Sequence, residues 1–386
     1  MASCWVEVNL DKLHRNFDAV QKLVGQGCGI IAVVKANAYG HGAIEVGREF
    51  VAAGAVALAV TRLDEALPLR AAGLDGPILL LTPPLPDEVD EVVAQNLIAC
   101  ITGYEEGARL AAAAERAGRQ VVAELKVNTG MGRLGIEPEY ALDVANRLTA
   151  LPQIKLRGAF THFARAAERD TAGTHEQFAR FQPMVHHLSR ALQVPPHNFH
   201  CANSAALLRF PSMRLSLVRP GTVLYGQFPS VMSGEAAHEQ GLVVEDAFSV
   251  KARIIAIKEL APGQYVGYGG EWRASKSSRI ATIAVGYADG LSQEPNTHYE
   301  PPHVALRRTG RKAMKEIAQW SGLKAGDPIR TVSWRGAKAP IIGRIAMQQC
   351  SIDIGHFPEI RIGDEVVVTM RRTSAGGHLP RVYVRD

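Results

Sequence analysis

Residues 29–72 read GIIAVVKANAYGHGAIEVGREFVAAGAVALAVTRLDEALPLRAA. This stretch holds two short apolar runs rich in β-branched residues, Gly29–Val34 and Val56–Val60, and a helical pattern follows at Arg62–Ala72. Apolar runs of this length, bounded by turns, are typical of buried strands. Strands that alternate with helices favour parallel pairing through crossover connections. The stretch therefore predicts an α/β fold built from repeated strand–helix units.

The same unit recurs along the first part of the chain. Eight apolar runs are present, at Gly29–Val34, Val56–Val60, Pro77–Leu81, Leu97–Ile101, Val121–Val127, Leu156–Thr161, Asn198–Cys201 and Ser216–Val218. Helical patterns lie between them, for example at Asp87–Gln95, Glu105–Ala117, Glu139–Leu148 and Thr174–Leu192. Eight such units in about 220 residues match a (β/α)8 TIM-like barrel. A doubly wound open sheet is the alternative, but the first strand is not followed by its GxGxxG turn.

The pattern changes near Ser233–Gln240, where short β-like runs replace the strand–helix units. These runs are Ala247–Lys258, Arg279–Val285, Pro328–Trp334, Ala339–Ile345, Cys350–Ile354 and Asp364–Thr369. Gly, Pro and Asp separate them, which is typical of a mainly β domain. We therefore predict a barrel over residues 1–236 and a C-terminal β domain over residues 237–386. The stretch Glu294–Gly326, Pro-rich and then basic, is interpreted as an insertion in the second domain.

Composition excludes several classes of protein. The 386 residues are 47% hydrophobic and 21% charged, which provides packed cores and excludes a largely disordered chain. The formal net charge of +5 is mild and does not indicate nucleic-acid binding. No apolar run reaches the roughly 18 residues of a membrane span, and no apolar signal core opens the chain, so we expect a cytoplasmic protein without a membrane partner. The five cysteines lack metal-ligand spacing, which predicts reduced, mostly buried thiols.

Catalytic residues of such barrels lie at the carboxyl ends of the strands. Five of the predicted strands lead into groups that can do chemistry or hold an anion: Lys35, Lys126 with Arg133, His162, Asn203 with Ser204, and Arg219. Lys35 closes an apolar run, and burial of an amine lowers its pKa and makes it nucleophilic. Such an amine suits an imine with a carbonyl substrate or with pyridoxal phosphate. A lysine that extends outward to pair with a carboxylate is the alternative.

Ser204, Gly221 and Thr222 follow the seventh and eighth predicted strands. Barrels often hold phosphate at this place, and a hydroxyl beside the N–H groups of a Gly-containing turn binds anions. Helix capping by Ser204 and an ordinary turn at Pro220–Gly221 are the alternatives.

Two tyrosines of the predicted β domain are flanked by glycines, Tyr268 in VGYGGEW and Tyr287 in AVGYADG. A tyrosine on such a loop can project into a cleft. Since its free pKa is about 10, it needs help to act as a base. A packed tyrosine with its hydroxyl bonded to backbone is the alternative.

The sequence resembles the alanine racemases over most of its length. Eight motifs occur in the family's order: AVVKANAYGHG, KVNTGMGRLG, THFA, CANSAA, VRPGTVLYG, VGYG, GYADG and GRIAMQQC. Members of that family are pyridoxal-phosphate enzymes with an N-terminal TIM-like barrel and a C-terminal β domain. The resemblance implies a homodimer with shared active sites that interconverts L- and D-alanine by two-base proton transfer at Cα. It also implies a supply of D-alanine for cell-wall peptidoglycan.

The resemblance implies roles for single residues as well. Lys35 would hold the cofactor covalently and act as one base, and Tyr268 of the other subunit would be the second base. Arg219 would face the pyridine nitrogen, and His162 would link Tyr268 to Arg219. Arg133 would steady Tyr268 or the substrate carboxylate. The family's cofactor contacts match Lys35, Tyr39, Asn203, Ser204, Arg219, Gly221, Thr222 and Tyr225, its substrate contacts match Arg133, Met347 and Tyr287, and its often carboxylated lysine matches Lys126.

The sequence departs from the family at a few positions. Gln348 and Asn128 stand where Asp is common, and no tyrosine near the C-terminus matches one that contacts the phosphate. A racemase of serine or of a larger or basic amino acid therefore remains open, as does a retro-aldol enzyme using the same cofactor. The presence of both Lys35 and Tyr268 favours racemisation, because a lyase needs a base on one Cα face only. The second domain disfavours a single-barrel cofactor carrier.

Overall fold

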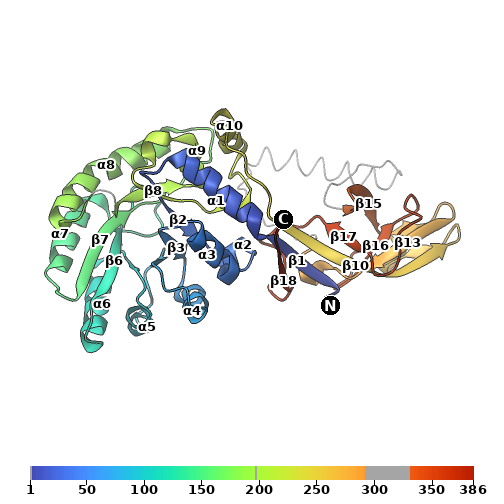
Figure 1. Cartoon of the computed structure of the whole chain (residues 1–386), viewed down its shortest axis with the longest axis horizontal. Coiled ribbons are helices and arrows are strands. Elements are labelled where there is room, and N and C mark those ends of the chain that lie inside the picture. Colours follow the sequence, from blue (N-terminus) through green and yellow to red (C-terminus); the bar gives the residue numbers. More distant parts are fainter. Residues whose placement is uncertain (1, 196–197, 292–330) are drawn as a thin grey trace. The chain divides into compact units, whose positions relative to one another are not determined.

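The computed structural model describes residues 2–195, 198–291 and 331–386, which form two compact units (Figure 1). The barrel unit comprises Asn9–Ala247 with Val384–Asp386, and the β unit comprises the residues through Val8 with Phe248–Tyr383. The expected boundary at 236/237 differs from this division. The amide of Asn16 bonds the backbone carbonyl and N–H of Glu245, so the segment after α10 (Val231–Glu239) stays with the barrel. The stretch Glu294–Gly326 lies outside the described residues.

The barrel unit contains an eight-stranded parallel sheet, as the sequence predicts. Its strands are β2 (Gly29–Val33), β3 (Ala57–Val60), β4 (Ile78–Leu80), β5 (Ala99–Ile101), β6 (Val121–Lys126), β7 (Ile154–Phe160), β8 (His200–Asn203) and β9 (Leu217–Arg219). They pair in the order β4-β3-β2-β9-β8-β7-β6-β5, and a parallel bridge between Leu79 and Ile98 joins the two ends of the sheet. The predicted (β/α)8 barrel is therefore confirmed.

Helices alternate with these strands along the chain. They are α1 (Leu10–Val24), α3 (Ala43–Ala52), α4 (Leu63–Ala71), α5 (Val89–Ala94), α6 (Tyr104–Arg116), α7 (Pro138–Thr149), α8 (Ala172–Leu192), α9 (Ser204–Arg209) and α10, with a short turn α2 (Lys35–Tyr39). In α1 the buried side chains Leu10, Leu13, Phe17 and Val20 recur at helical spacing and face the core. Within the described ranges, no helix has the length and apolarity needed to cross a membrane.

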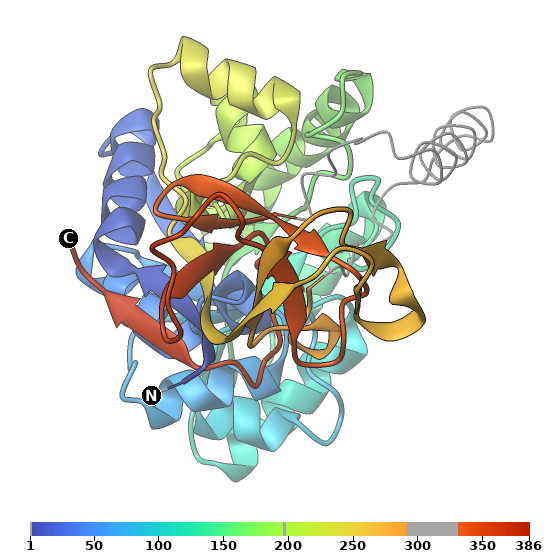
Figure 2. The same ribbon diagram turned by 90° about the vertical axis from the view of Figure 1, so that its right-hand side faces the viewer.

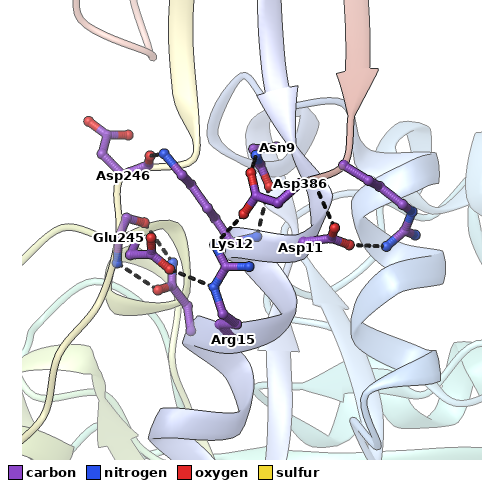
Figure 3. Close-up of polar contacts among 9 residues, drawn as sticks. Asn9, Asp11, Lys12, Arg15, Glu245, Asp246 and Asp386 are labelled. Carbon is purple, nitrogen blue, oxygen red and sulfur yellow. Dashed lines mark hydrogen bonds and ion pairs between the residues drawn. The ribbon is translucent and has the colours of Figure 1, made fainter.

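Charged side chains surround the first turn of α1 in the barrel unit (Figure 3). Arg15 donates to Glu245 at 2.7 Å and to Asp386 at 2.6 Å. Asp11 accepts a hydrogen bond from the Arg385 guanidinium at 2.5 Å and one from the backbone N–H of Asp386 at 2.9 Å. These ion pairs hold residues 384–386 on the barrel unit.

The β unit contains a second eight-stranded sheet, in the order β13-β16-β15-β14-β17-β10-β1-β18. Its strands are β1 (Cys4–Asn9), β10 (Phe248–Leu260), β13 (Ser278–Ile283), β14 (Thr331–Trp334), β15 (Ala337–Ile342), β16 (Cys350–Asp353), β17 (Glu365–Val368) and β18 (Arg381–Val384), beside a small pair, β11 (Tyr265–Val266) and β12 (Trp272–Arg273). The predicted mainly β domain is therefore confirmed.

One strand of this sheet comes from the other end of the chain. Blue β1 pairs antiparallel with yellow β10, with Cys4 opposite Ala252 and Val8 opposite Phe248 (Figure 2). The sequence analysis assigned these first residues to the barrel domain. The strand alternates buried and partly buried residues only from Val6 to Asn9, and its partner lies far along the chain, so sequence proximity gives no sign of the pairing.

Candidate active site

A cavity of about 520 Å³ lies at the carboxyl ends of the barrel strands. Its wall includes residues at or just past the ends of most strands. Lys126, Asn203 and Arg219 end their strands, and residues one or two positions past a strand are Lys35, Thr61, Leu81, His162 and Ser204. Tyr39, Arg133, Gly221 and Thr222 join them from the loops. The structure thus brings together ten of the residues singled out from the sequence.

The described wall of this cavity is strongly basic. Lys35, Lys126, Arg133 and Arg219 all line it, and among the described lining residues there is no aspartate or glutamate. Burial lowers the pKa of the Lys35 amine, and the nearby Arg133 lowers it further. A neutral amine is a nucleophile, and the surrounding cations favour an anionic ligand.

A left-handed turn follows Lys35. Ala36, Asn37, Ala38 and Tyr39 have φ between 52° and 54°, a conformation that costs roughly 1–2 kcal/mol for each non-glycine residue. The Glu65 carboxylate accepts the N–H of Ala36 at 2.6 Å, and the Asn37 side chain accepts the N–H of Ala43 at 2.8 Å. Such strain persists where the surroundings fix it. Here it turns Tyr39 toward the cavity wall.

Tyr39 and Ser204 meet at the turn after β9. The Ser204 hydroxyl oxygen accepts the N–H of Gly221 at 2.9 Å and that of Val223 at 3.4 Å, so its own hydrogen is the part that can serve an anion. A Cβ on residue 221 would lie 2.2 Å from the Tyr39 hydroxyl. Only glycine therefore fits between the backbone and Tyr39.

Two of the residues expected to contact the cofactor, Tyr225 and Asn203, instead use their side chains in contacts within the protein. Tyr225 is fully buried and does not line the cavity; its hydroxyl donates to the carbonyl of Val33 at 2.9 Å, and its ring packs on Tyr39 with centroids 4.9 Å apart. Asn203 lines the cavity, but its side-chain oxygen caps α9 by accepting the N–H of Ala206 at 3.0 Å. Tyr225 thus supports Tyr39 from behind.

Arg219 is buried at the end of β9. Its guanidinium donates to the carbonyl of Thr161 at 2.6 Å and to the carbonyl and Nδ1 of His200. His200 in turn contacts Glu124 at 2.9 Å, and Arg157 donates to the same carboxylate at 2.7 Å. Burial lowers the pKa of Arg219 to about 10, so the side chain stays cationic at neutral pH.

The sequence analysis missed His200 and Glu124. The sequence signal that could have found them is a polar residue inside a buried strand. His200 is that residue in HCAN of β8, and Glu124 is that residue in VVAELK of β6. Both side chains are fully buried. Burial lowers the pKa of His200, and a neutral ring matches its contacts, since one nitrogen accepts from Arg219 and the other donates to Glu124.

His162 and Lys126 lie near Arg219. Burial, together with the charge of Arg219, lowers the pKa of His162 to about 3, so its ring is neutral. Burial lowers the pKa of Lys126 to about 8, with Arg219 adding to the effect. The Lys126 ammonium donates to the carbonyl of Leu81 at 3.0 Å and lies 4.9 Å from the centre of the Phe160 ring.

Arg133 is carried by a closed loop after β6. Backbone hydrogen bonds join Asn128 to Ile136 and Ile136 to Lys126, each at 2.8 Å, and the Asn128 side chain accepts the N–H of Gly132 at 2.9 Å. An asparagine at position 128 therefore still closes the loop. The loop directs Arg133 to the cavity wall.

The remaining expected residues lie in the β unit. Tyr268 is 71% exposed on a turn between Gly267 and Gly269, whose φ values of 77° and 71° suit glycine. Tyr287 and Met347 are held together, because the N–H of Tyr287 donates to Ala346 at 3.0 Å and that of Ala288 donates to Met347 at 2.9 Å. These exposed side chains belong to a different unit from Lys35.

The fold and the cavity define a class of enzyme, a (β/α)8 barrel with a cavity-lining lysine just past the end of the first barrel strand, joined to a β domain. Residues 8–229 match the alanine racemase N-terminal domain, and residues 247–317 and 322–378 match the alanine racemase C-terminal domain. The chain belongs to the alanine racemase family.

Individual relatives agree with this assignment. Alanine racemase of Desulforamulus reducens is 36% identical over 94% of this chain and 89% of its own length, and that of Clostridium tetani is 33% identical over 99% and 95%. A solved alanine racemase of Clostridium difficile superposes with a TM-score of 0.84 at 27% identity, over 100% of this chain and 97% of its own. Another structure of that enzyme contains cycloserine.

Proposed function

We propose that the protein interconverts L- and D-alanine with pyridoxal 5′-phosphate as cofactor. The observation that carries this proposal is the cavity at the strand ends, whose described lining contains four basic residues, Lys35 among them, and no carboxylate. The cations complement a phosphate and an amino-acid carboxylate together. The alanine racemase names of the relatives support alanine as the substrate.

The side chains of the cavity fit this cofactor. Lys35 supplies the amine that attaches it, and the Ser204 hydroxyl with Tyr39, Gly221 and Thr222 supplies the polar end for the phosphate. Arg219 is suited to the pyridine nitrogen; because a guanidinium has donors only, it would favour that nitrogen unprotonated. The bound cofactor supplies an electron sink that acidifies the Cα proton of the substrate.

Two proton-transfer groups are needed, one on each face of Cα. We assign Lys35 to one face and Tyr268 from a second copy of the chain to the other, which makes the active unit a homodimer. The exposure of Tyr268, Tyr287 and Met347, at 71%, 46% and 58%, supports a role for these side chains outside their own unit. Neutral His162 would hydrogen-bond Tyr268 and link it to Arg219.

Arg133 would bind the substrate carboxylate, with Tyr287 and Met347 beside it. Lys126 would pair with Arg133 after carboxylation, in which its amine adds to carbon dioxide and releases a proton; the lowered pKa of Lys126 supports this, because the neutral amine is the reacting form. The D-alanine produced would supply cell-wall peptidoglycan. The cytoplasmic location expected from the sequence stays a prediction.

The test is proton exchange at Cα in deuterated water. Purified protein with pyridoxal phosphate is mixed with L-alanine and, in parallel, with L-serine, L-lysine and L-arginine. NMR follows loss of the Cα proton, and chiral chromatography follows the D-isomer. We expect exchange and inversion to be fastest with alanine. Faster inversion of serine or a basic amino acid would assign a different substrate, and exchange without inversion would remove Tyr268 as the second base.

A further inference from the structure

One buried carboxamide joins two walls of the cavity. Gln177, in the first half of α8, is only 4% exposed. Its Nε2 donates to the carbonyl of His162 at 3.2 Å and to the Thr129 hydroxyl at 3.3 Å, and its Oε1 accepts the N–H of Ala164 at 2.9 Å. Both ends of the amide are therefore in use, as buried polar groups require.

The two segments that Gln177 joins carry residues of the proposed site. His162, Phe163 and Ala164 follow β7 and line the cavity. Thr129 lies in the loop after β6 that carries Arg133. The two segments belong to separate loops of the barrel. Removing the amide would therefore remove hydrogen bonds that join these loops near the cavity.

Further hydrogen bonds extend this connection to Arg219. The hydroxyls of Thr129 and Thr161 are 2.7 Å apart, and both side chains are buried. The carbonyl of Thr161 accepts the Arg219 guanidinium at 2.6 Å. Thr129 is thus connected through Thr161 to the guanidinium of Arg219.

The chemistry of the amide explains why this position needs glutamine. The two segments present an N–H on one side and a carbonyl with a hydroxyl on the other, so the side chain must accept and donate together. An ionised glutamate accepts only, and leucine of similar size does neither. Either substitution leaves a partly buried polar backbone group without its partner.

We propose that Gln177 is a positioning residue that fixes His162 and Arg133 relative to each other without touching the substrate. This inference rests on the proposed function. It predicts that loss of the amide acts on turnover and on binding of the amino acid, while attachment of the cofactor at Lys35 is retained.

The test compares Gln177→Leu and Gln177→Glu with Gln182→Leu, a control at an exposed position of the same helix. For each protein, kcat and KM are measured in both directions across a range of pH, and cofactor binding is followed by visible absorbance. For Gln177→Leu we expect kcat to fall about tenfold and KM for alanine to rise several-fold, with cofactor affinity within about twofold of the parent. The control is expected to match the parent.

The pH dependence of Gln177→Glu distinguishes loss of the hydrogen bonds from a general loss of folding. A protonated carboxyl again offers one donor and one acceptor, so activity relative to the parent should recover as pH falls, whereas that of Gln177→Leu should not. Unchanged kcat and KM in Gln177→Leu, or loss of activity only in proportion to lost cofactor, would overturn the inference.

A second measurement does not depend on the substrate. Backbone hydrogen exchange, read by mass spectrometry, is expected to rise in residues 128–135 and 161–166 of Gln177→Leu and to stay unchanged in Gln182→Leu. Unchanged exchange in both segments contradicts the positioning role even if the parent protein is inactive on alanine. Inactivity of the parent alone, with raised exchange in the variant, would reject only the proposed function.

Discussion

The carboxylate of Glu65 accepts the backbone N–H of Ala36, the residue immediately after Lys35, at 2.6 Å. Its other oxygen accepts the N–H of Thr61 at 2.7 Å, just past the end of β3. One side chain on α4 therefore joins the ends of two neighbouring strands. It also fixes the start of the left-handed turn that brings Tyr39 to the cavity.

Glu65→Gln is expected to weaken cofactor binding about tenfold, because an amide has one accepting oxygen in place of two and bonds to a charged acceptor contribute about 1.5–3 kcal/mol. The measurement is a titration of the protein with pyridoxal phosphate followed by visible absorbance. Asp64→Asn is the control, since Asp64 is an exposed neighbour whose side chain pairs with the exposed Arg62. Equal affinity in the two variants would contradict the role of Glu65.

Lys35→Ala is expected to abolish racemisation and to remove the borohydride-reducible absorbance of the bound cofactor, since no second amine replaces the proposed attachment point. Among the described lining residues, Lys126 is the other lysine of the cavity, so Lys126→Ala serves as the comparison. Mass spectrometry after borohydride reduction identifies the modified peptide. A label that stays on the Lys35→Ala protein would assign attachment to another residue.

Mixing two inactive variants tests the shared site. Lys35→Ala and Tyr268→Phe are each expected to be nearly inactive, but random exchange of subunits gives mixed dimers with one intact site, so activity should recover to about a quarter of the parent's. The activity of the mixture is measured after denaturant-assisted exchange and compared with each variant treated alone. No recovery, with exchange verified by a mass tag, would place both groups on one chain.

Gly221→Ala is expected to impair the phosphate side of the site. The added Cβ would lie 2.2 Å from the Tyr39 hydroxyl, so Tyr39 must move. Affinity for pyridoxal phosphate should fall by at least tenfold, whereas pyridoxal without the phosphate should bind as before. Gly103→Ala, where a Cβ meets no atom within 4 Å, is the control. A parallel loss for both ligands would point to general damage.

Fully buried His200 and partly buried His162 give the protein a defined response to acid. Burial lowers the pKa of His200 and brings that of His162 to about 3, while an unfolded histidine titrates near 6.5. Because the unfolded state then binds more protons, the free energy of unfolding should fall below about pH 6.5, by up to about 1.4 kcal/mol per pH unit for each ring. Urea unfolding at about pH 7.5 and about pH 5.5 measures this. A His162→Asn variant should show the shallower dependence.

The barrel could be predicted because each of its strands is a short, buried apolar run that stands out from the neighbouring helices. The strand ends could be predicted as a site for a geometric reason, since parallel strands in a barrel converge at one rim. Lys35 and Arg219 could therefore be predicted as site residues from their positions at the strand ends, without any knowledge of side-chain contacts.

Residues whose role depends on contacts between distant segments could not be found this way. Gln177 lies in an ordinary amphipathic helix, and Glu124 on β6 and His200 on β8 gain meaning only as a pair that meets across the intervening strand β7. Tyr225 lies in a motif that resembles the family's, yet its side chain supports Tyr39 from behind. Strand β1 escaped notice because its partner β10 is remote in sequence.

The chain passes between its two units three times, after Val8, after Ala247 and after Tyr383. No single break can therefore separate one unit from the other, and a fragment that ends near Ala247 would leave β1 without β10. During synthesis, β1 is made before β10, and it cannot pair with β10 until the barrel residues between them have been translated. Fragment expression and domain grafting in this protein accordingly require a circularly permuted chain, in which the β1 segment is moved next to its sheet.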